Sequence, residues 1–266
     1  MATQAEKGSA FAALHEGEAF IIPNPWDIGS AKMLAGLGFQ ALATTSAGFA
    51  FTLGRRDGGV TLGELTDHVR ALDGATALPV SVDLENGYGP APEDAARAII
   101  AVAEAGAVGG SIEDYDPDGG FYEFDHAVER VAAASEAARS LGFPFTFTAR
   151  AENFVRGNPD RDDTIARLQA YERAGADVLY APWLRTTEQI AAVCDAVSRP
   201  VNVLAYPGLP VSMEEIVSAG ARRVSVGGWL TMAAVAAAAD AAVEMRDSGS
   251  FAALRAPAGI SDWLAG

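Results

Sequence analysis

Five carboxylates stand where short apolar runs of the sequence end. Asp83 and Glu85 close one run, Glu113 and Asp114 close the next, and Asp57 follows an earlier one. If these runs are parallel strands, their carboxyl ends meet at one mouth, and like charges that close together need a counter-charge. Oxygen ligands with no His or Cys nearby select a hard cation, so Mg²⁺ is the expected ion, with Mn²⁺ as the second choice.

The spacing of Asp83 and Glu85 fits such a site. Residues two apart on an extended strand point to the same side, so one carboxylate can bind the ion while the other holds its water. The alternative is structural, because a single acidic residue in such a loop more often caps a helix or solvates the loop. Five at successive strand ends favour the metal site.

Arg150 ends another apolar run, where burial of a guanidinium is costly unless it faces a carboxylate or an anionic ligand. Two interpretations stay open, namely an ion pair with Glu113 or Glu152 and contact with an anionic substrate. The small-residue turn 44–48 offers backbone N–H groups that can cradle a carboxylate. Asn202, on a later apolar run, is predicted to contact the same substrate.

The elements that must position these residues alternate along the chain. Helical segments such as 92–106, 127–141, 162–175, 187–197 and 213–220 begin near acidic residues and several end at Gly. Eight strand–helix units in 266 residues favour an α/β fold of the closed (β/α)8 barrel type, a TIM barrel. We expect one domain, 1–266, whose apolar tail 247–266 serves oligomerisation. The predicted strands are 20–23, 41–45, 79–83, 109–113, 145–149, 178–181, 201–205 and 223–226.

The composition argues against some classes of binding partner. With 19 basic and 35 acidic residues the net charge is -16, which disfavours nucleic acid and anionic membrane surfaces. The only cysteine, Cys194, excludes an intrachain disulfide and fits a reducing cytoplasm. The N-terminus lacks a signal-peptide pattern, and the Ala-rich stretch 232–243, too short to span a bilayer, is expected to pack on protein. The three histidines are expected at the surface or in helix caps.

Several motifs stand in order along the chain. They are Asn24-Pro25-Trp26-Asp27, Thr45-Ser46-Ala47-Gly48 with Leu53-Gly54 and Asp57, Asp83-Leu84-Glu85-Asn86-Gly87-Tyr88-Gly89, Ser111-Ile112-Glu113-Asp114, and Thr148-Ala149-Arg150-Ala151-Glu152. In this order and at these intervals they resemble a known family, the isocitrate lyase/phosphoenolpyruvate mutase superfamily. The similarity runs from about residue 18 to about residue 245, and the segment 83–89 with the following Glu-Asp and Ala-Arg pairs is quite specific.

This resemblance implies a barrel whose last helix is swapped with a neighbouring subunit, in a homodimer or homotetramer. It implies Mg²⁺ bound directly by Asp83, with Asp57, Glu85 and Glu113 holding its waters. It also implies that the turn 45–48 grips the substrate carboxylate through backbone amides and that Arg150 steadies a developing oxyanion. The shared intermediate of the family is a pyruvate enolate.

The sequence departs from the family in the loop after 109–113. Isocitrate and methylisocitrate lyases carry a Lys-Lys/Arg-Cys-Gly-His loop, whereas the segment 115–122 has no Cys, Lys or His. Phosphoenolpyruvate mutase carries an Asn with neighbouring Lys and Thr in this loop and a Trp at the position of Ala43, and neither is present. Tyr122 or Asp118 is the available acid or base in the loop.

The sequence therefore predicts a Mg²⁺-dependent lyase or decarboxylase that cleaves a C–C bond of a small 2-oxo or 2-hydroxy carboxylate. Two alternatives stay open: P–C bond chemistry, as in phosphonopyruvate hydrolase or the mutase, and an inactive 2-oxo-acid binding protein. A barrel of unrelated chemistry is the weakest option. The predicted catalytic residues are Asp57, Glu113, Tyr122 and Arg150; the substrate contacts are Thr45, Ser46, Ala47, Gly48, Asp83, Arg150 and Asn202; the metal ligands are Asp83, Glu85 and Glu113.

Overall fold

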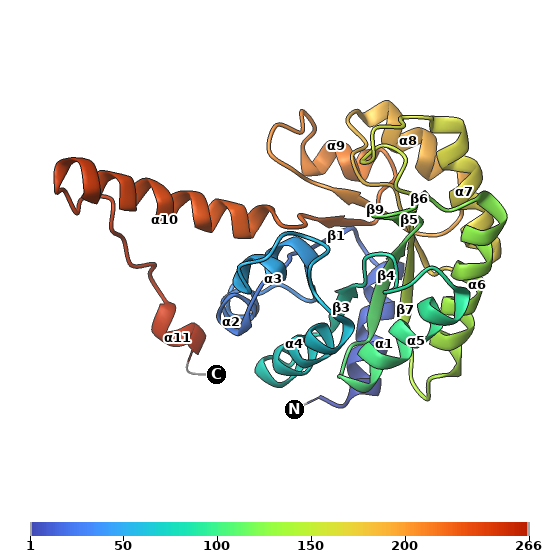
Figure 1. Ribbon diagram of the computed structural model, residues 1–266, viewed down its shortest axis with the longest axis horizontal. Helices are drawn as coiled ribbons and strands as arrows, with labels where there is room; N and C mark the ends of the chain where they lie inside the picture. The colour runs from blue at the N-terminus through green and yellow to red at the C-terminus, as the bar shows by residue number, and fades with distance from the viewer. Residues whose placement is uncertain (1, 265–266) are drawn as a thin grey trace.

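The strands form one nearly closed barrel. The computed structural model describes residues 2–264 (Figure 1). Eight parallel strands pair in the order β1-β10-β9-β8-β7-β4-β3-β2, and the Ala43 N–H donates to the Pro23 carbonyl at 3.0 Å across the remaining seam. Each predicted run overlaps one strand, which confirms the (β/α)8 barrel. The strands are β1 (Phe20–Ile22), β2 (Leu42–Ala43), β3 (Val80–Asp83), β4 (Gly109–Glu113), β7 (Thr146–Arg150), β8 (Val178–Tyr180), β9 (Val201–Leu204) and β10 (Arg223–Ser225).

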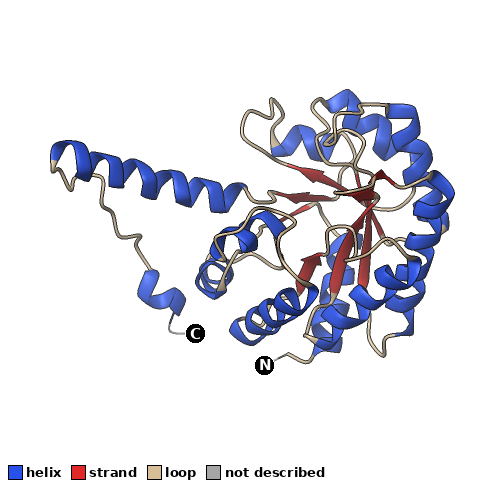
Figure 2. Cartoon of the chain, in the orientation of Figure 1, coloured by secondary structure: helices blue, strands red, loops and turns tan. Residues whose placement is uncertain are grey.

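Helices surround this barrel (Figure 2). Strand residues that face outward, such as Val82, Phe147 and Leu179, are buried against the helices in one large apolar core. The helices keep water from the outer faces of the strands, which favours apolar side chains there. The surrounding helices are α2 (Ile28–Gly36), α3 (Ser46–Thr52), α4 (Leu62–Ala75), α5 (Pro92–Glu104), α6 (Phe124–Ser140), α7 (Arg161–Arg173), α8 (Thr187–Ala196) and α9 (Met213–Ser218).

Helix α1 (Gln4–Glu16) closes the amino-terminal end of the barrel. Its Phe11 packs with Phe20 and Val108, which lie at or just before the starts of strands. His15 of the same helix is buried between the rings of Phe11 and Phe20. His68 on α4 is also buried, so the expectation of surface or capping histidines is wrong for both, because each packs against aromatic rings.

The carboxyl-terminal helices depart from the barrel. Helix α10 (Trp229–Ser248) projects away from it (Figure 1), and its apolar residues Trp229, Met232 and Val243 are exposed. The expectation that the Ala-rich stretch packs on protein is therefore not met within this chain. Helix α11 (Ile260–Leu264) returns to contact α2, and the predicted tail is described only as far as residue 264. No described helix is long and apolar enough to cross a membrane.

The loop after β4 folds into a small hairpin that the sequence pattern did not predict. Strands β5 (Tyr115–Asp116) and β6 (Gly120–Phe121) pair antiparallel, and the rings of Tyr115 and Phe121 meet edge to face at 5.3 Å. Gly120 has φ +84, a conformation that glycine adopts without strain. This hairpin lies within the segment 115–122, where the sequence departs from the family.

Candidate active site

A cavity of about 360 Å³ opens at the carboxyl ends of the barrel strands. Parallel strands bring residues that are far apart in the sequence to this end, which is where barrel enzymes bind their substrates. The structure brings together most of the predicted site residues. Those that line the cavity are Thr45, Ser46, Ala47, Asp57, Asp83, Glu85, Glu113, Arg150 and Asn202.

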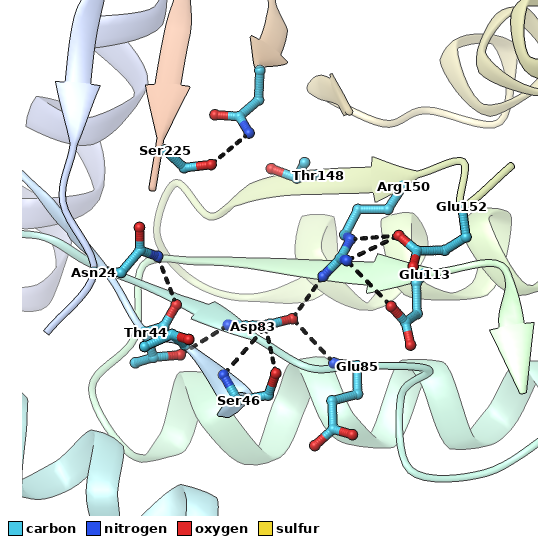
Figure 3. Close-up of polar contacts among 12 residues, drawn as sticks. Asn24, Thr44, Ser46, Asp83, Glu85, Glu113, Thr148, Arg150, Glu152 and Ser225 are labelled. Carbon is cyan, nitrogen blue, oxygen red and sulfur yellow. Dashed lines mark hydrogen bonds and ion pairs between the residues drawn. The ribbon is translucent and has the colours of Figure 1, made fainter. Parts of the chain in front are cut away.

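Arg150 at the end of β7 lies at the centre of the charged groups (Figure 3). Its Nη1 is 3.0 Å from Asp83 Oδ1, and its Nη2 is 3.3 Å from Glu113 Oε2 and 2.9 Å from Glu152 Oε1. Three carboxylates around one buried guanidinium hold the pKa of Arg150 well above its ordinary value, against the opposing effect of burial. Ion pairing and an anion-binding role, which the sequence left as alternatives, are thus both compatible with its position.

Asp83 is fixed from both sides of the barrel mouth. Its Oδ2 accepts a hydrogen bond from the Ser46 hydroxyl at 2.9 Å, and its backbone N–H donates to the Thr44 hydroxyl at 2.9 Å. Asn24 orients Thr44 in turn by donating to its carbonyl at 2.9 Å (Figure 3). The Asp83 carboxylate is therefore preorganised, with one oxygen facing Arg150 and the other facing Ser46.

The turn that precedes α3 forms one wall of the cavity. Thr45 is the N-cap of α3, and its hydroxyl accepts from the Gly48 N–H at 3.3 Å. Gly48 does not line the cavity, so its predicted substrate contact is not supported, because its N–H is used in the cap. The Ala47 N–H makes no hydrogen bond within residues 2–264 and lies beside the cavity. Ser46 and Ala47 are thus the turn residues placed to contact a ligand.

The remaining carboxylates of the mouth lie where burial and neighbouring negative charges disfavour their ionised form. Burial, together with the charges of Asp83 and Asp57, raises the pKa of Glu85 to about 7. Burial and the Asp83 charge raise the pKa of Asp57, and burial with Glu152 raises that of Glu113 well above its ordinary value. Glu85 also has φ +50, a strained conformation for a residue with a side chain, and its Oε1 is buried without a hydrogen-bond partner.

These residues fit a divalent cation. The carboxylates of Asp57, Asp83, Glu85, Glu113 and Glu152 line the cavity mouth against the guanidinium groups of Arg150 and Arg156. No three His, Cys, Asp or Glu side chains among the described residues converge closely enough to hold a metal by themselves. This geometry suits Mg²⁺, which binds one or two carboxylates directly and keeps several waters for the others to hold. Asp83 would bind the ion, with Glu85 and Glu113 facing its waters.

Arg156 is a site residue that sequence reasoning missed. It lies six positions beyond the end of β7, and its Nη2 is 3.2 Å from Glu113 Oε1. Its Nε is 3.2 Å from Glu152 Oε2, and its guanidinium stacks on the Tyr115 ring of the hairpin at 4.2 Å. A signal existed in the i,i+4 spacing of Glu152 and Arg156, but only the structure shows that Arg156 joins the acidic cluster to the hairpin.

Asp114 does not belong to the cavity. It follows Glu113 directly, so the alternation of an extended strand turns it to the opposite side. There it accepts from Tyr171 Oη at 2.5 Å and from Arg167 Nη1 at 3.2 Å. The prediction that it lies at the barrel mouth is wrong, and its contacts are structural.

Replacing Tyr171 tests this structural role. Tyr171→Phe removes a hydrogen bond to a buried carboxylate, and we expect the free energy of unfolding to fall by about 1–3 kcal/mol in denaturant titrations. Tyr206→Phe is the control, because the Tyr206 hydroxyl has no hydrogen-bond partner among residues 2–264. Equal stability of the two variants would contradict the structural role.

Tyr122 also lies away from the cavity. Its ring packs under the Arg130 guanidinium, 4.2 Å from the ring centroid, and its hydroxyl accepts from Asn86 Nδ2 at 3.2 Å. It is nearly fully buried and does not line the cavity. The predicted acid/base role of Tyr122 is therefore not supported, because its side chain packs in the core beside the start of α6 and does not reach the cavity. Asp118, the alternative acid or base predicted from the sequence, is exposed on the hairpin and does not line the cavity either.

The raised pKa of Glu85 predicts that Mg²⁺ binding weakens in acid. An acid whose pKa is raised to about 7 is mostly protonated below that pH and must lose its proton when the ion binds. Its ionised fraction falls about tenfold from pH 8 to pH 6, so we expect the Kd for Mg²⁺ to rise about tenfold in calorimetric titrations. Glu85→Gln should flatten this dependence.

Glu64→Gln is the matched control for that experiment. Glu64 is outside the cavity, and its pKa is lowered to about 2 by Arg55 and by the Thr61 cap, so it stays ionised over this range. The control should keep the wild-type pH dependence. A wild-type Mg²⁺ affinity that is the same at pH 6 and pH 8 would contradict the role given to Glu85.

The carboxylates of the cavity mouth and Arg150 lie at the carboxyl ends of the strands, which is where barrel enzymes carry their active sites. The chain matches the phosphoenolpyruvate phosphomutase family over residues 11–246. It belongs to that family, and thereby to the isocitrate lyase/phosphoenolpyruvate mutase superfamily.

Similar proteins with solved structures or assigned activities share most of the chain. A Burkholderia cenocepacia J2315 structure described as that of a lyase/mutase is 52% identical, with a TM-score of 0.95, over 99% of this chain and 97% of that chain. An oxaloacetate decarboxylase of Bradyrhizobium sp. (strain BTAi1) is 32% identical over 79% of this chain and 74% of the relative. An oxaloacetate acetylhydrolase, solved with its product oxalate, is 26% identical, with a TM-score of 0.86, over 97% and 94% of the two chains.

Proposed function

We propose that this protein is a Mg²⁺-dependent lyase or decarboxylase that breaks a C–C bond of a small 2-oxo or 2-hydroxy carboxylate. The observation that carries the proposal is the placement of Arg150 between Asp83 and Glu113 in one cavity. The similarity to an oxaloacetate decarboxylase and an oxaloacetate acetylhydrolase supports C–C cleavage of this class of substrate.

The chemistry that the site supports is formation of an enolate. In a 2-oxo acid such as oxaloacetate, the C–C bond to the departing carboxylate breaks, CO₂ leaves, and the electron pair of that bond forms the enolate of the 2-oxo group, which then takes up a proton. In a 2-hydroxy acid the hydroxyl loses its proton and becomes the carbonyl of the 2-oxo product, while the electron pair of the broken C–C bond stays with the departing carboxylate fragment as its enolate, which then takes up a proton. Bound Mg²⁺ would act as a Lewis acid toward the substrate oxygens. Ser46 and Ala47 are placed to orient the substrate carboxylate. Arg150 supplies a fixed positive charge near the oxygen on which negative charge develops, and this preorganisation lowers the barrier.

A substrate panel tests this function. Purified protein with Mg²⁺ is incubated with 2-oxo and 2-hydroxy diacids, including oxaloacetate and substituted malates, and the products are followed by proton NMR. We expect a 2-oxo acid product from at least one compound at a rate that depends on Mg²⁺. Phosphonopyruvate is included with phosphorus NMR detection. Cleavage of the P–C bond would identify the phosphonate alternative, and oxalate binding without turnover across the panel would identify a binding protein.

We also propose that α10 packs against a second copy of the chain, as the swapped helix of a homodimer or homotetramer. Its exposed apolar residues Trp229, Met232 and Val243 support this. Sedimentation velocity should show an oligomer for the wild type and a smaller species for Trp229→Asp with Met232→Asp. A monomeric wild type would contradict the proposal.

A further inference from the structure

The cavity continues below the carboxylates to a second charged group, Arg223. This residue begins β10 and is buried, yet it lines the same cavity as Asp83. Between the two levels the barrel interior is polar, since Ser81, Ser111 and Ser225 also line the cavity. Barrel interiors are usually filled by bulky aliphatic side chains, so a hydroxyl-lined passage that ends at a cation is unusual.

Within the described part of the chain, the guanidinium of Arg223 is bonded only to neutral groups. Its Nε donates to Asn202 Oδ1 at 2.9 Å, its Nη2 donates to Thr148 Oγ1 at 3.1 Å, and its Nη1 lies 3.3 Å from His15 Nε2. A guanidinium has five N–H groups, so two of them have no partner within residues 2–264. No carboxylate of the described chain forms an ion pair with it, in contrast to Arg150, which has three.

The histidine partner does not supply the missing negative charge. Nδ1 of His15 is 2.8 Å from the Phe11 carbonyl and must donate there, so Nε2 is the acceptor that faces Arg223. Burial and the neighbouring Arg223 charge lower the pKa of His15 to about 3, so this imidazole is neutral at pH 7. Burial also lowers the pKa of Arg223, to about 10, which leaves the guanidinium charged. A buried, uncompensated cation is costly unless an anion accompanies it.

The cavity is therefore polarised, with an excess of carboxylates at the mouth and a lone cation at the floor. Strand β7 gives the distance between the Arg223 guanidinium at the floor and the charged groups at the mouth. Thr148 of this strand contacts Arg223, and Arg150 lies two residues further along it. Two residues of strand span about 7 Å. That length matches a chain of four or five carbon atoms between one carboxylate end and the next.

Resting on the proposed function, we infer that Arg223, oriented by Thr148 and Asn202, is a second anion subsite that binds a distal carboxylate of the substrate. The substrate is then a 2-oxo or 2-hydroxy acid with a further carboxylate about four carbons from its reacting end. Asn202, predicted from the sequence to contact the substrate, contributes by holding the guanidinium. Its Nδ2 donates to Ser225 at 2.9 Å, which fixes the amide with its oxygen toward Arg223.

The experiment compares chain-matched mono- and diacids. Wild-type protein with Mg²⁺ is titrated calorimetrically with 2-oxoadipate and 2-oxohexanoate, which differ only in the terminal carboxylate. A charge-assisted hydrogen bond in a buried site should make the diacid bind about 10- to 100-fold more tightly. Arg223→Gln should reduce this ratio to about 1–2, whereas Arg223→Lys, which keeps the charge, should retain part of it.

Two further titrations keep the result interpretable. Oxalate is too short to reach Arg223 at the floor of the cavity, so its Mg²⁺-dependent binding tests the carboxylates at the mouth alone. If the wild-type protein does not bind oxalate, the proposed function is wrong, whatever the result for Arg223. Thr148→Val is a milder change that can be used if the Arg223 variants do not fold. It removes one hydrogen-bond partner of Arg223 and should lower the ratio of diacid to monoacid affinity. Equal wild-type affinities for the two six-carbon acids, or an undiminished ratio in folded Arg223→Gln, would show that Arg223 only ties α1 to the barrel.

Discussion

Asp83→Ala is expected to lower kcat/KM on the substrate found in the panel by at least about 1,000-fold, because it removes the carboxylate that we propose as the direct Mg²⁺ ligand and with it the charge stabilisation of the enolate. The side chain also positions its neighbours, through Ser46 at 2.9 Å and Arg150 at 3.0 Å. Turnover is measured at saturating Mg²⁺, so that a weakened metal affinity is distinguished from a lost ligand.

The matched control for this prediction is Asp118→Ala. Asp118 is an exposed carboxylate on the hairpin that does not line the cavity, so its removal changes the net charge equally without touching the ring. We expect its kcat/KM to stay within about threefold of the wild type, as for most surface substitutions. Wild-type turnover in Asp83→Ala would show that the proposed mechanism is wrong.

Arg150→Met is expected to have the second-largest effect, on both turnover and stability. Removal of the charge that we propose stabilises the oxyanion should lower kcat by about 100- to 1,000-fold. It also takes away one of the two guanidinium groups that pair with the buried carboxylates of Glu113 and Glu152 and leaves them only Arg156, and loss of a partner from a buried ion pair typically costs about 3–5 kcal/mol. In thermal unfolding the Tm should therefore fall by roughly 10 °C or more.

Added Mg²⁺ should restore part of that stability, because a divalent cation supplies the missing counter-charge to the carboxylates. Arg161→Met is the control, since Arg161 is exposed and, among the residues that the structure describes, pairs only with Asp162 at 3.4 Å. Its Tm should change little, as expected for an exposed ion pair. An Arg150→Met protein with wild-type kcat would contradict the role given to Arg150, whatever its stability.

The fold was predictable because helices cover the outer faces of the strands. Strands covered in this way carry apolar side chains, so all eight appear as separate runs between turn residues. The helix that breaks the pattern is α10, whose Ala-rich sequence indicates a helix but carries no information about the surface on which it packs. The hairpin β5–β6 was missed because two-residue strands leave no alternating pattern to detect.

The site was predictable where side chains lie at strand ends and face inward. Asp83, Glu113 and Arg150 meet this condition, and the period of two also explains why Asp114 does not. Site residues that lie in loops, or deep in the barrel away from the strand ends, were not predicted. Arg156 reaches the ring from an irregular segment, and Arg223 stands at the start of a strand, where side chains usually pack the barrel floor.

A calorimetric titration of the wild-type protein with oxalate, an analogue of the pyruvate enolate, with and without Mg²⁺, shows whether the carboxylates at the barrel mouth form an enolate-stabilising metal site. We expect binding that requires Mg²⁺ and is absent in Asp83→Ala. No binding of oxalate by the folded wild-type protein under either condition would contradict the assignment of the carboxylate ring as an enolate-stabilising metal site.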